Sequence, residues 1–109
     1  MPYRVSLTHH AALDLEDIIS FIRRHDGVAH ARHVLERIEK AIRKLGEFPE
    51  RGVHPRELLD LGIREYREIF FRPYRIIYCT ERKQVTIVLI ADGRRDMQSL
   101  LELRLLGTV

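Results

Sequence analysis

The sequence contains a single cysteine and no long apolar run. Cys79 has no partner for an internal disulfide, and it lies in an apolar stretch where a buried, unreactive thiol is the usual outcome. The longest apolar stretches are far short of a membrane span, and residues 1–4 lack the apolar core of a signal peptide. We therefore expect a cytoplasmic protein that contacts no membrane.

The sequence also lacks the common motifs of cofactor and nucleophile chemistry. It has no glycine-rich phosphate loop and no serine–histidine–aspartate arrangement. His30 and His33 lie three residues apart in a predicted helix, but neither His9 nor His25 stands at a spacing that supports a third ligand. We predict no metal and no cofactor, and we interpret these histidines as an exposed polar face.

The composition is that of a small globular protein. The chain has 109 residues, of which 45% are hydrophobic and 32% are charged. This length predicts one domain over residues 1–109 with one hydrophobic core, too small for a large cofactor-binding architecture.

Basic charge is concentrated in the second half of the chain. Residues 64–95 contain eight cations and four acids, whereas residues 1–50 contain eight of each sign. Arginines outnumber lysines sixteen to three, and guanidinium groups bind carboxylates or phosphates through paired hydrogen bonds. The basic segment therefore predicts an acidic partner.

The apolar pattern of the first half predicts a strand followed by two helices. Residues 3–7 alternate between apolar and polar, as in a half-buried strand. Thr8 can cap a helix that reaches about Arg24, with apolar residues at three- and four-residue spacings. After turn residues at Asp26-Gly27, a second apolar stripe covers residues 31–45, and so short a connection makes the two helices antiparallel.

The second half predicts three strands and a final helix. The breaker-rich residues 48–55 form a loop, and the leucines at 58, 59 and 61 predict one helical turn. Strands are predicted at 63–71, 74–80 and 84–92, and their short connections require an antiparallel meander. A short helix is predicted from Met97 to Leu106. The expected fold is α+β, with an N-terminal strand and a helical hairpin packed on one face of a mainly antiparallel four-stranded sheet whose other face is exposed.

Five short segments, taken together, carry a family resemblance. They are Tyr3-Arg4-Val5, Leu15-Glu16-Asp17-Ile18, Phe48-Pro49-Glu50-Arg51-Gly52, Tyr74-Arg75-Ile76-Ile77-Tyr78 and Gly93-Arg94-Arg95-Asp96. In this order and spacing they resemble the RelE/ParE toxin superfamily, the plasmid-stabilisation toxins of type II toxin–antitoxin systems. The resemblance implies either of two mechanisms, because RelE-like members cleave messenger RNA in the ribosome and ParE-like members inhibit DNA gyrase without catalysis. The mechanism has to be argued from the site.

RNA cleavage needs a proton acceptor, a proton donor and cations that stabilise the phosphorane charge. If the chain is a nuclease, the resemblance assigns the cationic role to Arg75 and Arg95. Where RelE-like sequences have a tyrosine, however, this chain has Leu100 and Leu101, and no histidine follows His54. The missing acid and base argue against nuclease activity.

Tyr74 and Tyr78 are the substitutes that remain for an acid or base. Their strand positions favour another interpretation, in which the rings pack against the helices and the hydroxyls lie at the rim. Asp92 stands where ParE-like members often have a histidine, and it restores no catalytic group.

Four arginines of the basic segment are predicted to form a binding patch on one region of the sheet: Arg64, Arg75, Arg94 and Arg95. The alternative is that Arg75 pairs with an acid on a neighbouring strand and Arg95 with Asp92 or Asp96. The resemblance implies that such a patch receives the acidic, initially disordered tail of an antitoxin, which folds as it binds.

The sequence thus predicts a ParE-like toxin that binds DNA gyrase, forms a hetero-oligomer with its antitoxin and makes no sequence-specific contact with nucleic acid. One alternative is a RelE-like ribosome-dependent endoribonuclease. Another is a non-toxic partner or co-repressor of the antitoxin. The helix from Met97 to Leu106 could pack on the domain, contact the target or support a dimer.

Overall fold

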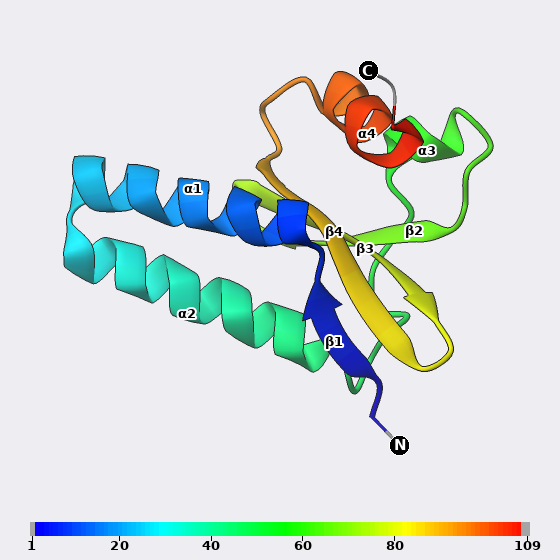
Figure 1. Cartoon of the computed structure of the whole chain (residues 1–109), viewed down its shortest axis with the longest axis horizontal. Coiled ribbons are helices and arrows are strands. Elements are labelled where there is room, and N and C mark those ends of the chain that lie inside the picture. The colour runs from blue at the N-terminus through cyan, green and yellow to red at the C-terminus, as the bar shows by residue number, and fades with distance from the viewer. Residues whose placement is uncertain (1, 108–109) are drawn as a thin grey trace.

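The computed structural model describes residues 2–107 and combines a helical hairpin, a sheet and two short helices (Figure 1). The elements are β1 (Arg4–Leu7), α1 (His9–Asp26), α2 (Val28–Lys44), α3 (Arg56–Leu59), β2 (Tyr66–Phe71), β3 (Tyr74–Glu81), β4 (Gln84–Asp92) and α4 (Met97–Leu106). The predicted α+β order of elements is confirmed. No helix in this described part of the chain has the length and apolar character needed to cross a membrane.

The sheet has the strand order β1-β4-β3-β2. Strands β2, β3 and β4 form the predicted antiparallel meander. β1 pairs in parallel with β4, with Arg4 opposite Gln84 and Leu7 opposite Ile87. This parallel pair is possible because the long connection through both hairpin helices returns the chain to the same sheet.

The helical hairpin forms at the predicted place. The Thr8 side chain accepts a hydrogen bond of 3.1 Å from the Ala11 backbone N–H and so caps α1. α1 continues to Asp26, two residues beyond the predicted end. Gly27 alone separates the helices, and its φ of 95° is a backbone conformation that favours glycine.

Two hydrophobic clusters lie on opposite faces of the sheet. The first cluster, between the hairpin and the sheet, includes Ile38, Leu45, Ile76, Tyr78 and Ile87. The second, between the sheet and α3 and α4, includes Leu58, Ile77, Leu89, Met97 and Leu101. The expectation of a single core with an exposed second sheet face is wrong, because leucines of α3 and α4 cover that face.

A β-bulge determines which residues of β4 face each cluster. Tyr78 lies opposite Ile87 and Ile77 lies opposite Leu89, so Val88 is an extra residue in β4. Strict alternation would place Ile87 and Leu89 on the same face, but they belong to different clusters. The extra residue moves Leu89 to the face that α4 covers.

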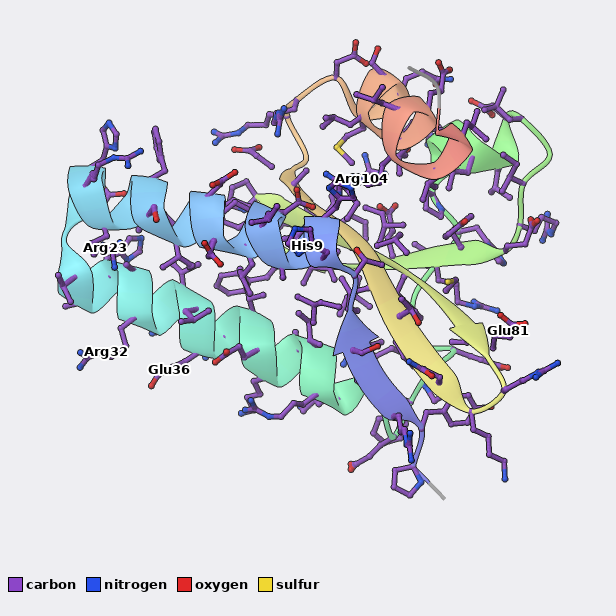
Figure 2. The ribbon with its side chains drawn as sticks, in the orientation of Figure 1. His9, Arg23, Arg32, Glu36, Glu81 and Arg104 are labelled. Atoms are coloured by element: carbon purple, nitrogen blue, oxygen red, sulfur yellow. The ribbon has the colours of Figure 1, made fainter. Side chains whose placement is uncertain are left out.

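An ion pair between the first and last helices lies beside this bulge. The Asp14 carboxylate accepts hydrogen bonds from the Ile90 backbone N–H at 3.0 Å and from the Arg104 guanidinium at 2.8 and 2.9 Å. Arg104 also donates to the Val88 carbonyl oxygen at 2.9 Å. Figure 2 shows Arg104 reaching from α4 toward the start of α1. Of the roles left open for α4, packing on the domain is therefore established.

Candidate functional site

Arg75 lies on β3, on the sheet face that α3 covers. Its Nη1 and Nη2 atoms donate to the two carboxylate oxygens of Glu57 at 2.9 and 2.8 Å, and its Nε donates to Glu68 at 2.7 Å. The Arg75 side chain is only 13% exposed. The predicted alternative that Arg75 pairs with an acid on a neighbouring strand is confirmed by Glu68 of β2, and Glu57 of α3 adds a second partner.

The two carboxylates respond differently to this arrangement. Hydrogen bonding to Arg75 lowers the pKa of Glu57 below its ordinary value. Burial raises the pKa of Glu68, because the loss of water outweighs the attraction of Arg75. Gly93 gives the arginine its room, since a Cβ atom at that position would lie 2.8 Å from Arg75 Cδ.

Tyr78 is fully buried, and its hydroxyl has two partners. The hydroxyl donates to the Pro49 carbonyl oxygen at 2.8 Å and accepts from the Gly52 backbone N–H at 3.0 Å. A Cβ atom on Gly52 would lie 2.7 Å from this hydroxyl, so only glycine fits there. The expectation that the hydroxyl lies at the rim is wrong for Tyr78, which instead ties residues 49–52 to β3.

A cleft of about 490 Å³ opens between α1, the start of β3 and the end of β4. From α1 it is lined by Asp14, Asp17, Ile18, Phe21, Ile22 and Asp26, and from the sheet side by Tyr74, Asp92, Arg94 and Arg95 among others. Burial raises the pKa of Tyr74, and the negative charges of Asp92 and Asp26 raise it further. The end of α1 and the start of β3 therefore face one another across the cleft.

Arg94 and Arg95 form the basic rim of this cleft. Arg94 binds Asp92 through Nε and Nη2, at 2.9 and 2.6 Å, and its side chain is 80% exposed. Arg95 makes no ion pair within residues 2–107, so the alternative pairing of Arg95 with Asp92 or Asp96 is wrong. Asp96 instead caps α4 by accepting a hydrogen bond from the Ser99 backbone N–H at 3.1 Å.

The structure does not bring the four predicted patch arginines together. Arg94 and Arg95 share the rim of the α1 cleft, whereas Arg75 is held in its ion pairs on the other face of the sheet. Arg64 is exposed and precedes β2 at the strand end where Tyr66 pairs with Cys79, far from the turn after β4. Side-chain alternation and strand register distribute the basic segment over three places.

The comparisons with known proteins identify the family. A family model described as the ParE toxin of the type II toxin–antitoxin system parDE matches residues 5–97. The chain belongs to the ParE toxin family. Toxin ParE3 of Caulobacter vibrioides is 30% identical to this ParE-family toxin over 94 residues, which cover 86% of this chain and 90% of ParE3. The predicted resemblance is confirmed, and membership implies a cognate antitoxin partner.

Two solved structures have the same fold as this ParE-family toxin. The chromosomal ParDE system from P. aeruginosa gives a TM-score of 0.68 at 17% identity and covers 83% of this chain and 95% of that chain. A mutant of E. coli toxin RelE in the free state gives a TM-score of 0.61 at 16% identity and covers 92% of this chain and 93% of that chain. Both branches of the superfamily therefore share this architecture.

The sequence did not lead us to predict the acidic residues that bind Arg75 or those that line the α1 cleft in this ParE-family toxin. Asp14, Asp17 and Phe21 lie at three- and four-residue spacings, so one helix face carrying them was predictable. The contact between Glu57 and Arg75 had no such signal, because the two residues are 18 positions apart and meet only through tertiary packing.

Proposed function

We propose that this ParE-family toxin inhibits bacterial DNA gyrase without catalysing a reaction, and that a cognate antitoxin neutralises it in a cytoplasmic hetero-oligomer. The observation that carries this proposal is the state of Arg75. The arginine assigned to charge stabilisation in RNA-cleaving relatives is bound here by two carboxylates, both from this chain.

The charges around Arg75 disfavour a phosphate. Ionised Glu57 and Glu68 together carry one more charge than the single guanidinium between them, so the local field repels an anion. An arginine whose bidentate face already binds a carboxylate has no equivalent face left for a phosphate. This site supports a role in structure rather than in RNA cleavage.

Two of the candidate positions for an acid or base point the same way. Leu101, one of the residues at the place of the RelE-like tyrosine, is 1% exposed and packs in the second cluster. The Tyr78 hydroxyl is occupied by the loop at residues 49–52. A general acid or base must reach its proton on the substrate, and neither position offers that.

In this proposal, the antitoxin binds two of the four arginines of the predicted patch. Arg94 and Arg95 are exposed and lie together at the rim of the α1 cleft, where acidic side chains of an antitoxin tail can bind. Arg75 and Arg64 are assigned no part in it.

The deciding experiment is supercoiling of relaxed plasmid by purified DNA gyrase with increasing amounts of this protein, alone and premixed with the product of the neighbouring gene. We expect supercoiling to be lost with the toxin alone and restored by the premix. A Tyr74→Phe variant should inhibit as the native protein does, because no role is assigned to this hydroxyl.

Two results would contradict the proposal. A folded protein that stops growth but leaves gyrase active would overturn it, and position-specific cuts in ribosome-bound messenger RNA would then establish the RelE-like alternative. Expression that leaves growth unchanged in the absence of the antitoxin would instead indicate a non-toxic partner or co-repressor.

A further inference from the structure

The lining of the α1 cleft includes apolar, partly exposed side chains. Ile18 and Phe21 from α1 face Tyr74 and Ile90 from the sheet across about 490 Å³. Phe21 is 54% exposed and stacks on His25, with ring centroids 4.0 Å apart. An aromatic ring left in water at the mouth of a cleft adds little to the fold, but it offers a docking point to an apolar side chain.

The α1 wall of the cleft carries negative charge that the chain does not compensate. Asp14 is paired with Arg104, and Asp92 on the opposite wall is paired with Arg94. Within residues 2–107, Asp17 and Asp26 form no ion pair.

The Asp26 carboxylate lies at an electrostatically unfavourable place. It is the last residue of α1, beside the negative end of the helix dipole, where a carboxylate is unfavourable. Helix stability therefore does not account for Asp26, whereas a cation bound beside it would be favoured by both the carboxylate and the dipole.

A purely acidic tail does not complement this cleft. Such a tail would bind the rim at Arg94 and Arg95 but would meet repulsion from Asp17 and Asp26 on the facing wall. The surface that complements the cleft is amphipathic, with an apolar side chain between a basic and an acidic group.

From this complementarity we infer that the cleft is the docking site for a segment of the antitoxin that inserts an apolar side chain against Phe21 and places a lysine or arginine beside Asp17 and Asp26. This inference rests on the antitoxin partner of the proposed function. It adds the chemistry of the contact, in which the basic group of the segment, and not only its acids, determines recognition.

The test is calorimetric titration of the native toxin and its variants with the full-length product of the neighbouring gene. The double variant Asp17→Lys/Asp26→Lys should bind on the order of 100-fold more weakly, because like charges then face one another. Phe21→Ala should weaken binding about tenfold through loss of an aromatic anchor. Each variant is first checked for native thermal unfolding.

The matched control is Glu16→Lys. Glu16 is also exposed on α1 and one residue from Asp17, but it lines a separate groove on the other side of the helix. Its substitution reverses one charge, as each of the two substitutions in the double variant does, and should leave the affinity within about twofold of native, as expected of a charge outside the contact. Equal weakening by Glu16→Lys would overturn the inference, because the effect would then be one of net charge.

Gyrase supercoiling separates this inference from the function on which it rests. The double variant should inhibit gyrase as the native toxin does but need more antitoxin for relief. Loss of gyrase inhibition with antitoxin affinity unchanged would overturn the inference by assigning the cleft to the target. Native affinity of the double variant for the antitoxin would overturn the inference alone, whereas failure of the native toxin to bind the antitoxin would overturn the proposed partner as well.

Discussion

Tyr78 shows how a single hydroxyl can hold a loop in place. Its two hydrogen bonds, to Pro49 and Gly52, join segments that are 29 and 26 positions away in the chain. The loop has no regular structure of its own, so these bonds and the bridge between Val53 and Glu68 fix its path against the sheet.

We predict that Tyr78→Phe lowers the free energy of unfolding by about 2 kcal/mol, because a buried N–H and a carbonyl oxygen both lose their partner. Urea denaturation measures this difference. Tyr74→Phe is the matched control, because the Tyr74 hydroxyl makes no side-chain hydrogen bond within the described residues and its loss should have little effect. Equal effects of the two substitutions would argue against the assigned role of the Tyr78 hydroxyl.

Glu57 and Glu68 should give opposite dependences of stability on pH. The raised pKa of Glu68 makes the folded state bind its proton more tightly than the unfolded state does, so this group favours folding less as pH rises. A Glu68→Gln variant does not have this pH-dependent loss of stability. Its stability relative to the native protein should therefore increase as pH rises through the raised pKa.

The lowered pKa of Glu57 works in the other direction. Its ionised form stabilises the fold above the unfolded pKa, near 4.3, and this contribution is lost as pH falls. The stability of Glu57→Gln relative to native should thus decrease as pH rises. Urea unfolding of both variants between about pH 3 and pH 7 tests the pair, and slopes of the same sign would contradict the assignment.

At the residue scale, local roles were predictable and tertiary ones were not. The cap by Thr8 follows from its place before an amphipathic segment. The packing of Gly93 against Arg75 depends on the meeting of β3 with the turn after β4, which no local pattern contains.

Among the elements, the hairpin between β3 and β4 turns through two residues that have positive φ and are not glycine. Arg82 and Lys83 have φ values of 52° and 62°, a conformation that side chains with a Cβ atom disfavour. Two consecutive positive φ values are typical of the turn that Asn-Gly forms most readily.

We predict that the double substitution Arg82→Asn/Lys83→Gly raises the free energy of unfolding by about 1 kcal/mol or more, because it removes this strain. Thermal and urea unfolding provide the measurement. The double variant Arg82→Ala/Lys83→Ala removes the same two charges but introduces neither the asparagine nor the glycine, so it should give no gain. Stabilisation by the alanine variant would show that charge, and not backbone strain, is responsible.

The boundaries of helices and strands were predicted correctly where the apolar pattern and the flanking turn residues agree. β4 and α4 begin and end at the predicted residues, because a β-branched run and a leucine-rich run are each bounded by turn residues. β2 begins at Tyr66 and not at Ile63, because the Ile63 backbone N–H bonds to the Leu58 carbonyl and ends the preceding helical turn. Coverage of the second sheet face was missed, because short helices of four and ten residues carry too little pattern to show what they cover.

For the whole molecule, the pair of Asp14 and Arg104 connects helices from the two ends of the chain. Both side chains are mostly buried, with 16% and 22% exposure, and together they satisfy the Ile90 N–H and the Val88 carbonyl. These backbone groups have no strand partner there, because β1 ends at Leu7, opposite Ile87.

We predict that Arg104→Met destabilises the fold by about 2 kcal/mol, because it leaves the Asp14 carboxylate without its cation in a mostly buried place. Amide hydrogen exchange should become faster in α4 than in α2. Arg94→Met is the control, since its exposed pair with Asp92 should contribute nothing measurable. Uniform acceleration of exchange across both helices would contradict a specific attachment of α4.

The bulge at Val88 gives β4 the equivalent of a reading frame with a period of two. Residues before the bulge and residues after it are read in different frames, so odd-numbered Ile87 faces the hairpin and odd-numbered Leu89 faces α4. Deleting the extra residue, Val88, would restore a single frame and leave Ile87 facing the hairpin and Leu89 facing α4, as they do now. A one-residue deletion at Val88 should therefore be tolerated by both hydrophobic clusters, whereas a deletion elsewhere in β4 turns the residues between it and the bulge to the opposite face.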